Sequence, residues 1–266
     1  MNTKIIAEIG WNHMGDMDLA KKMINAAKDA GADYAKFQTW YTKNLKSGPW
    51  DTDGRLELYK KSQLSKDQHY LLKDYCDEVG INFLTSIFNA EDAGWLADLS
   101  KDALKVPSME IQNHDILKAI DEKFDIIIIS TGAANWDEIL EAKNIINASE
   151  LHLLHCVSSY PTLAHNINLP RINKILEVHP NVGYSGHLKG IDDAIASLYY
   201  KPSFIEKHFT IDNSLPGRDN EFSITPDDLK RLVDYRNNFE LMNTDLGRDM
   251  QEVELDVHNN YRGRWS

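Results

Sequence analysis

The chain has 266 residues, of which 42% are hydrophobic and 26% are charged, and its formal net charge is −12 at pH 7. This length suits one large domain, and the negative charge argues against nucleic acid or an anionic membrane surface as the main partner. Two cysteines, Cys76 and Cys156, are too few for a disulfide framework and fit a reducing compartment. We find no signal peptide and no apolar run near the ~20 residues of a membrane span, so we expect a cytoplasmic protein.

Short β-branched runs alternate along the chain with segments whose apolar residues recur at helical spacing. Strands are predicted at residues 4–9, 33–38, 81–85, 103–106, 125–130, 151–156, 181–185 and 203–208. Helices are predicted at residues 19–30, 71–79, 91–99, 116–120, 136–146, 172–178, 191–199 and 226–242. Eight such units favour a single-domain (β/α)8 TIM barrel over an open doubly wound sheet, and no G-x-G-x-x-G motif follows the first strand. We assign the barrel to residues 1–245 and a C-terminal tail to residues 246–266.

Residues 40–64 form a long connection after the second predicted strand. Connections of this length are usually functional or mobile. The aromatic residues Trp40, Tyr41 and Trp50 favour a packed lid over a disordered insertion.

Polar side chains occur near the carboxyl ends of all eight predicted strands, where barrel enzymes carry their chemistry. Lysine and glutamate are rarely buried without a partner, and for any one residue a solvated strand end or a salt bridge is the simpler explanation. Their recurrence at the same end of every strand instead indicates an anion pocket. Its candidate cations are Lys36 and Lys105, and its candidate hydroxyl donors include Ser86, Ser108 and Ser130.

Two histidines, His187 and His208, follow or end neighbouring strands. They are plausible ligands for a divalent metal with open coordination positions, and the alternative is one general acid/base histidine and one structural histidine. Cys156 adjoins His155, but successive strand residues face opposite sides. A Cys–His nucleophile pair is therefore not expected, and we predict a packing role for Cys156.

Taken together, the strand-end strings resemble the N-acetylneuraminate (sialic acid) synthase family from Ile5 to about Thr244. The strings are IAEIG at 6–10, KFQT at 36–39, KVPS at 105–108, ISTG at 129–132, LHC at 154–156, YPT at 160–162, GYSGH at 183–187, IEKHFT at 205–210 and GRD at 217–219. One string alone would be weak, but the ordered set on eight strands is specific.

The resemblance implies a metal-dependent condensation of phosphoenolpyruvate with an N-acylated sugar aldehyde, giving a nonulosonic acid and phosphate. It implies that His187 and His208 hold the metal, Mn²⁺ or Mg²⁺. It places catalysis and the sugar side at Glu8, Tyr160, Glu206 and Asp219, and substrate binding at Lys36, Gln38, Ser86, Lys105, Ser108, Ser130, Ser158 and Ser185. It also implies a homodimer.

The chain departs from the family pattern near the sugar side. The family usually has aspartate at the position of Gly186, asparagine at that of Ser158 and proline at that of Arg218, and smaller or acidic residues at those of Trp11 and Met14. The sequence also stops about where the linker to the family's small C-terminal antifreeze-like domain would begin. We therefore expect a barrel without that domain. Either residues 40–64 or a partner chain covers the sugar side of the site, or the acceptor is one that needs less enclosure.

Three other functions stay open from the residues. One is a phosphoenolpyruvate-dependent synthase acting on a smaller or phosphorylated aldehyde, to give a smaller 3-deoxy-ulosonate. The second is a Schiff-base aldolase with Lys36 or Lys105 as nucleophile, although neighbouring hydroxyls and histidines favour anion binding. The third is a non-catalytic barrel that binds a sugar phosphate or a partner protein.

Overall fold

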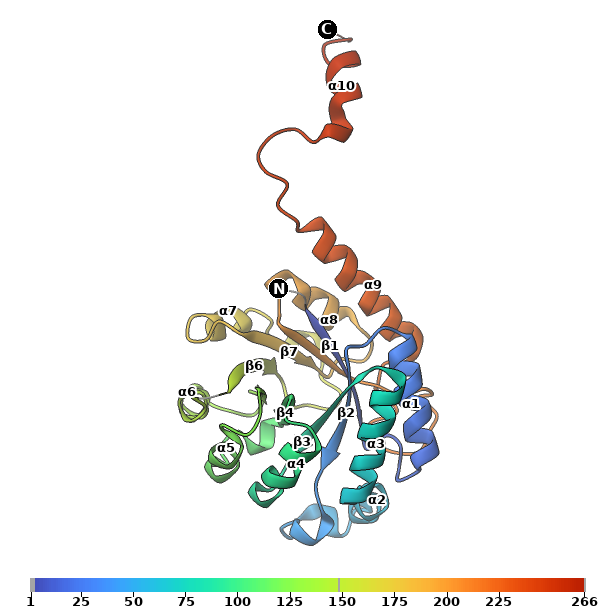
Figure 1. The fold of residues 1–266 in the computed structure, drawn as a ribbon, viewed down its shortest axis with the longest axis vertical. Helices are drawn as coiled ribbons and strands as arrows, with labels where there is room; N and C mark the ends of the chain where they lie inside the picture. The colour runs from blue at the N-terminus through green and yellow to red at the C-terminus, as the bar shows by residue number, and fades with distance from the viewer. Residues whose placement is uncertain (1–2, 148, 266) are drawn as a thin grey trace.

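The computed structural model describes residues 3–147 and 149–265, and its centre is a closed ring of eight parallel strands in the order β1 to β8 (Figure 1). The strands are β1 Lys4–Gly10, β2 Tyr34–Thr39, β3 Asn82–Ile87, β4 Ala103–Val106, β5 Ile126–Ser130, β6 Glu150–Cys156, β7 Val182–Gly186 and β8 Phe204–His208. Every predicted strand is present, with bounds within two residues of those expected. The predicted TIM barrel is confirmed.

Helices cover the outside of the ring (Figure 1). The helices of the described residues are α1 Met17–Asp29, α2 Arg55–Ser62, α3 Lys66–Val79, α4 Ala93–Leu99, α5 His114–Ile120, α6 Trp136–Ile145, α7 Arg171–Leu176, α8 Asp192–Ser197 and α9 Pro226–Met242, with α10 Leu255–Asn260 lying beyond the barrel (Figure 1). All eight predicted helices occur. Helix α3 begins five residues earlier than predicted because Ser65 and Gln68 form a capping box, in which each side chain bonds the other residue's backbone N–H.

Two segments expected to lack regular structure contain helices. The connection after β2 contains α2 and two short 3-10 turns, so much of it has regular structure. Its helix was missed because its apolar residues show almost no helical periodicity. Beyond α9, the chain leads to α10, which stands away from the barrel (Figure 1), and residues 241–250 and 252–265 are exposed. The predicted division between barrel and tail at residue 245 stays a prediction.

The interior of the ring is apolar at one end and polar at the other. Apolar side chains fill the end where the strands begin: Ile6, Leu84, Ala103, Ile128, Leu154 and Phe204. Two residues further along each of these six strands, the same inward face carries Glu8, Ser86, Lys105, Ser130, Cys156 and Glu206. Side chains two residues apart along a strand point to the same face of the sheet. The barrel interior therefore has a layer of polar side chains next to a layer of apolar ones.

Candidate active site

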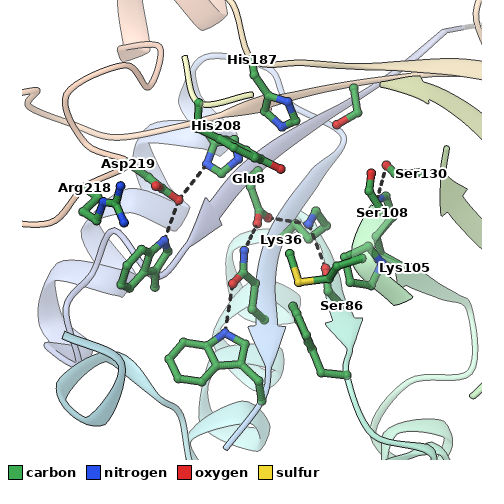
Figure 2. Close-up of a pocket in the computed structure, with 18 of the residues that line it drawn as sticks. Glu8, Lys36, Ser86, Lys105, Ser108, Ser130, His187, His208, Arg218 and Asp219 are labelled. Carbon is green, nitrogen blue, oxygen red and sulfur yellow. Dashed lines mark hydrogen bonds and ion pairs between the residues drawn. The ribbon is translucent and has the colours of Figure 1, made fainter. Parts of the chain in front are cut away.

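A cavity of about 660 Å³ opens at the carboxyl ends of the strands (Figure 2). All predicted site residues except Ser158 line it: Glu8, Lys36, Gln38, Ser86, Lys105, Ser108, Ser130, Tyr160, Ser185, His187, Glu206, His208 and Asp219. The residues expected to meet at one end of the barrel therefore do so. Ser158 is exposed and is not among the lining residues, although its hydroxyl makes a contact with the side chain of Tyr160.

Lys36 lies between two buried carboxylates at the base of this cavity. Its Nζ is 2.7 Å from Oε2 of Glu8 and 3.6 Å from Oε2 of Glu206, and it donates a hydrogen bond to Oγ of Ser86 at 3.0 Å. Burial alone would lower the pKa of the Lys36 ammonium, but the two carboxylates raise it. Lys36 is therefore charged at neutral pH.

The two carboxylates beside Lys36 have opposite pKa shifts. Burial raises the pKa of Glu8, and the ammonium of Lys36 does not fully offset it. Burial would also raise the pKa of Glu206, but the ammonium groups of Lys105 and Lys36 lower it overall. When the pKa values of two neighbouring carboxyl groups move apart, the group with the raised pKa can act as a proton donor and the other as a base. Here these are Glu8 and Glu206.

Lys105 differs from Lys36 because no carboxylate of residues 3–147 and 149–265 forms an ion pair with it. Its Nζ donates to Oγ of Ser130 at 2.6 Å and to the carbonyl of Val106 at 3.4 Å. Its side chain is 2% exposed, and burial lowers the pKa of its ammonium. The direct hydrogen-bond acceptors of Lys105 are thus neutral, and Glu206 attracts its ammonium only from beyond ion-pair distance. An anionic ligand bound next to this ammonium would neutralise it directly.

Serine hydroxyl groups and the loop at Gly132 lie on the side of the cavity near Lys105. Ser108 Oγ accepts a hydrogen bond from the backbone N–H of Gly132 at 3.2 Å. A Cβ added at Gly132 would lie 2.3 Å from Oγ of Ser158 and 2.8 Å from Oγ of Ser108, so a larger residue would displace these hydroxyls. Gly132 therefore permits the close approach of the loop after β5 to the anion pocket.

The two predicted metal-binding histidines are neighbours at the cavity wall. The ring centroids of His187 and His208 are 5.4 Å apart, and Tyr160 lies beside both rings, 4.1 Å and 5.9 Å away. Nδ1 of His187 is 2.9 Å from the carbonyl of Val157, which orients that ring. Burial lowers the pKa of His208 well below its usual range and keeps its imidazole neutral, which is the ligating form.

Cys156 lines the cavity as well, which its predicted packing role did not anticipate. Its Sγ lies 3.8 Å from Nδ1 of His187 and 3.6 Å from Oγ of Ser108. His155 faces the other way and contacts the carbonyl of Ile167, so the expected separation of the two neighbours is confirmed.

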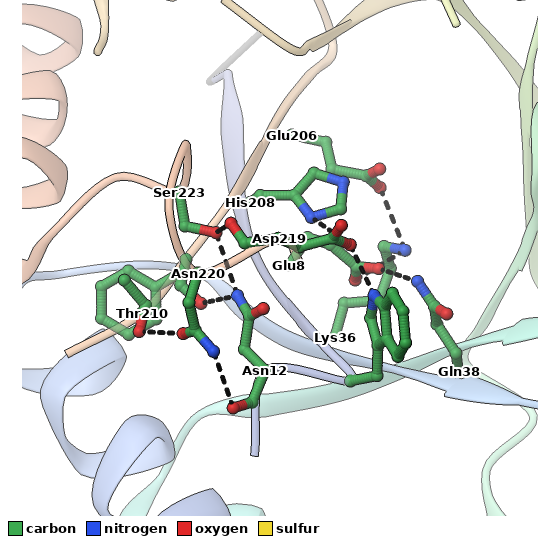
Figure 3. A network of polar contacts seen from close by, with 12 residues as sticks. Glu8, Asn12, Lys36, Gln38, Glu206, His208, Thr210, Asp219, Asn220 and Ser223 are labelled. Atoms are coloured by element: carbon green, nitrogen blue, oxygen red, sulfur yellow. Dashed lines mark hydrogen bonds and ion pairs between the residues drawn. The ribbon is translucent and has the colours of Figure 1, made fainter. Parts of the chain in front are cut away.

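Asp219 reaches the site from the loop that follows β8. Its Oδ2 lies 3.5 Å from Nδ1 of His208 and accepts a hydrogen bond from Nε1 of Trp11 at 2.6 Å. The loop is held in place by Ser223, which donates to the backbone carbonyl of Asp219, and by Asn12, which donates to Ser223 (Figure 3). Burial raises the pKa of the Asp219 carboxyl group.

A second series of side-chain hydrogen bonds runs from Glu8 to Trp40, at the start of the connection after β2. Gln38 donates to Oε1 of Glu8 at 2.6 Å and accepts at its own Oε1 from Nε1 of Trp40 at 3.0 Å. Gln38 thus links the side chain of Trp40 to that of Glu8, so the orientation of Glu8 depends on where Trp40 lies.

Several cavity residues were not predicted from the sequence. Among them are Trp40, Tyr41, Arg55, Tyr59, Met109, Lys189 and Glu221, while Trp11 was noted only as a departure from the family pattern near the sugar side. Arg55 and Tyr59 belong to α2, whose helix was not predicted. Trp40 and Tyr41 were noted only as packing residues of a lid.

Comparison with known proteins gives consistent matches. A model of the NeuB family matches residues 23–247. An N,N'-diacetyllegionaminic acid synthase of Campylobacter jejuni is 36% identical over 247 residues, which cover 86% of this chain and 74% of that protein. The human N-acetylneuraminate-9-phosphate synthase is 32% identical, over 86% of this chain and 68% of its own length. A crystal structure of an N-acetylneuraminic acid synthetase from Leptospira borgpetersenii, in complex with citrate, has a TM-score of 0.89 at 31% identity and covers 99% of this chain and 94% of that one.

No helix in the described part of the chain combines the length and apolar character that crossing a membrane requires.

Proposed function

The chain belongs to the NeuB family, and from that premise we propose that it condenses phosphoenolpyruvate with an N-acylated, hexosamine-like sugar aldehyde. The products are a sialic-acid-like 2-keto-3-deoxy sugar acid and phosphate. The synthases matched above form carbon–carbon bonds, and this chain is an enzyme of that kind. The observation that carries the substrate assignment is the buried ammonium of Lys105, which hydrogen-bonds Ser130 and forms no ion pair with the described residues, at the base of a cavity large enough for both substrates.

Phosphoenolpyruvate supplies two anionic groups, and the cavity base offers a matching set of donors. Lys105, with Ser130 and Ser108, is free to bind one anionic group without breaking an existing ion pair. Lys36 and Ser86 lie on the adjoining strands and bind the other anionic end. In this pose the lysines also stabilise the negative charge that develops on the departing phosphate.

In the proposed reaction, C3 of phosphoenolpyruvate forms a bond to the aldehyde carbon, and the aldehyde oxygen gains a proton. Water adds to C2, and the C2–O bond to phosphate then breaks while the new C2 hydroxyl group gives its proton to the departing phosphate, so that a ketone remains at C2. Glu206, whose pKa is lowered, takes the proton from this water. Glu8, whose pKa is raised, supplies the proton to the aldehyde oxygen, with Asp219 and Tyr160 flanking the sugar.

His187 and His208 would hold the divalent metal. Their fit is supported by the neutral state of His208, whose buried Nδ1 forms no hydrogen bond with the described residues and lies 3.5 Å from Oδ2 of Asp219. It is also supported by the Val157 carbonyl, which fixes His187 through Nδ1 and leaves Nε2 to ligate. Within residues 3–147 and 149–265 no group of three or more ligating residues is assembled, so water or substrate would complete the coordination. When bound, such a metal polarises the aldehyde as a Lewis acid.

The test is phosphate release from phosphoenolpyruvate with Mn²⁺, using a panel of aldehydes from short sugars to N-acylated hexosamines. We expect release that depends on an N-acylated acceptor. Release only with small aldehydes would favour the smaller 3-deoxy-ulosonate synthase, and no release with any acceptor would overturn the proposal.

A Schiff-base aldolase is the second candidate, because the lowered pKa of Lys105 is also what an amine nucleophile needs. Borohydride reduction in the presence of pyruvate distinguishes the two. We expect no covalent adduct; an adduct at Lys105, together with activity indifferent to chelator, would favour the aldolase. The homodimer and the cytoplasmic location stay predictions, which sedimentation and cell fractionation test.

A further inference from the structure

Trp11 and Trp40 both hydrogen-bond, directly or through one residue, to carboxylates of the proposed site. Nε1 of Trp11 donates to Oδ2 of Asp219 at 2.6 Å. Nε1 of Trp40 donates to Oε1 of Gln38 at 3.0 Å, and Gln38 in turn donates to Glu8 at 2.6 Å. Hydrogen bonds to carboxylates are strong and directional, so these contacts fix the orientation of two side chains that the reaction uses.

Tyr59 of α2 lies against both tryptophans. Its ring centroid is 5.2 Å from that of Trp11 at a tilt of 35°, and 5.5 Å from that of Trp40 in an edge-to-face arrangement at 74°. These separations are in the range that aromatic pairs favour. One side chain of the connection after β2 therefore contacts the residues that orient Asp219 on one side and Glu8 on the other.

We propose that Trp11 is a positioning residue for Asp219, and that Tyr59 holds Trp11 and Trp40 so that the connection after β2 sets the orientation of both site carboxylates. Trp11 is 9% exposed, and its indole N–H has one hydrogen-bond partner among the described residues, so its position is well defined. The inference rests on the proposed function, since it assumes that Asp219 takes part in the reaction.

The first test is a double-mutant cycle between Trp11 and Asp219. Trp11→Phe keeps an aromatic ring beside Tyr59 but removes the N–H donor. Loss of a hydrogen bond to a charged group predicts a fall in kcat of roughly 10- to 100-fold, with the KM for phosphoenolpyruvate unchanged. If Trp11 acts through Asp219, the same change in an Asp219→Asn background lowers kcat by less than about twofold.

Two outcomes of this cycle would contradict the inference. One is an equal loss of kcat on Trp11→Phe in both backgrounds, which would mean that Trp11 acts independently of Asp219. The other is an Asp219→Asn enzyme as active as the wild type, which would remove the carboxylate to be positioned.

The second test does not require activity. The chain has six tryptophans, so its amide correlation spectrum contains six indole N–H signals, and Trp11→Phe identifies the one from Trp11. We expect this signal to shift in Asp219→Asn and to keep its position in the matched control Asp212→Asn, which alters an exposed carboxylate of the same loop. An unchanged Trp11 signal in Asp219→Asn would refute the contact.

Tyr59 is tested in the same spectrum. Tyr59→Leu should shift the signals of both Trp11 and Trp40, whereas Tyr235→Leu, at an exposed tyrosine of α9, should shift neither. Indole signals of Trp11 and Trp40 that stay unchanged in Tyr59→Leu would contradict the role of Tyr59. Signals that shift equally in Tyr59→Leu and Tyr235→Leu would contradict it as well. If the wild type releases no phosphate with any acceptor but these shifts appear, the proposed function has failed and the side-chain coupling has not.

Discussion

Nζ of Lys36 lies 2.7 Å from Oε2 of Glu8, and both side chains are buried inside the barrel. Glu206 approaches the same ammonium from β8 at 3.6 Å. A buried cation between two carboxylates is stable only as a set, because removing one member leaves the others uncompensated. Lys105, one strand beyond Ser86, has no carboxylate of the described residues at ion-pair distance. This asymmetry between the two lysines leads to two opposite predictions.

Lys36→Met should strongly destabilise the fold. It leaves Glu8 without its ion-pair partner and next to Glu206, so the free energy of unfolding at pH 7 should fall by about 3–5 kcal/mol. Denaturant unfolding monitored by circular dichroism measures this. A change below about 1 kcal/mol would show that the ion pair is not formed in solution.

Lys105→Met should leave the fold as stable as the wild type or more stable. The substitution removes a buried charge that forms no ion pair with the described residues and that burial disfavours more than the attraction of Glu206 favours it. The methionine side chain fills a similar space. The same variant should lose the thermal stabilisation that phosphoenolpyruvate gives the wild type. A destabilised variant that still responds to phosphoenolpyruvate would contradict the assignment of Lys105 to the anion pocket.

Much of this site could be predicted because the barrel imposes strict alternation. Lys36, Lys105 and Glu206 are unusual residues for inward-facing strand positions, and the fold brings the carboxyl ends of all strands together. The contributions of Trp11 and Tyr59 could not be predicted in this way. They belong to irregular connections, whose packing depends on contacts between segments far apart in the sequence. Helix α2 carries no periodic apolar face that would reveal it.

His13 should make stability depend on pH below neutrality. Burial lowers the pKa of His13 from 6.5 to about 4, and its Nδ1 accepts a hydrogen bond from the backbone N–H of Gly15. Between these two pH values the unfolded chain binds the proton and the folded chain does not, so stability falls as the pH drops. The loss should approach roughly 3 kcal/mol near pH 4. Unfolding of His13→Gln across pH 4–7 should show a shallower slope than wild type; equal slopes would contradict this.

Removal of divalent metal should abolish condensation and leave the fold intact. Since His187 and His208 are the proposed ligands, His208→Ala should weaken Mn²⁺ binding by at least about tenfold in calorimetry. His114→Ala, at a half-exposed histidine at the start of α5, is the matched control and should bind Mn²⁺ as the wild type does. Equal Mn²⁺ affinity in both variants would rule out His208 as a ligand.

The most direct test of the central claim uses phosphoenolpyruvate labelled with ¹⁸O in the oxygen that bridges C2 and phosphorus. Condensation with cleavage of the C2–O bond predicts that the label leaves in the phosphate, and that its release requires both the sugar aldehyde and the metal. Phosphate without the label, or release that is independent of the acceptor, would contradict the account.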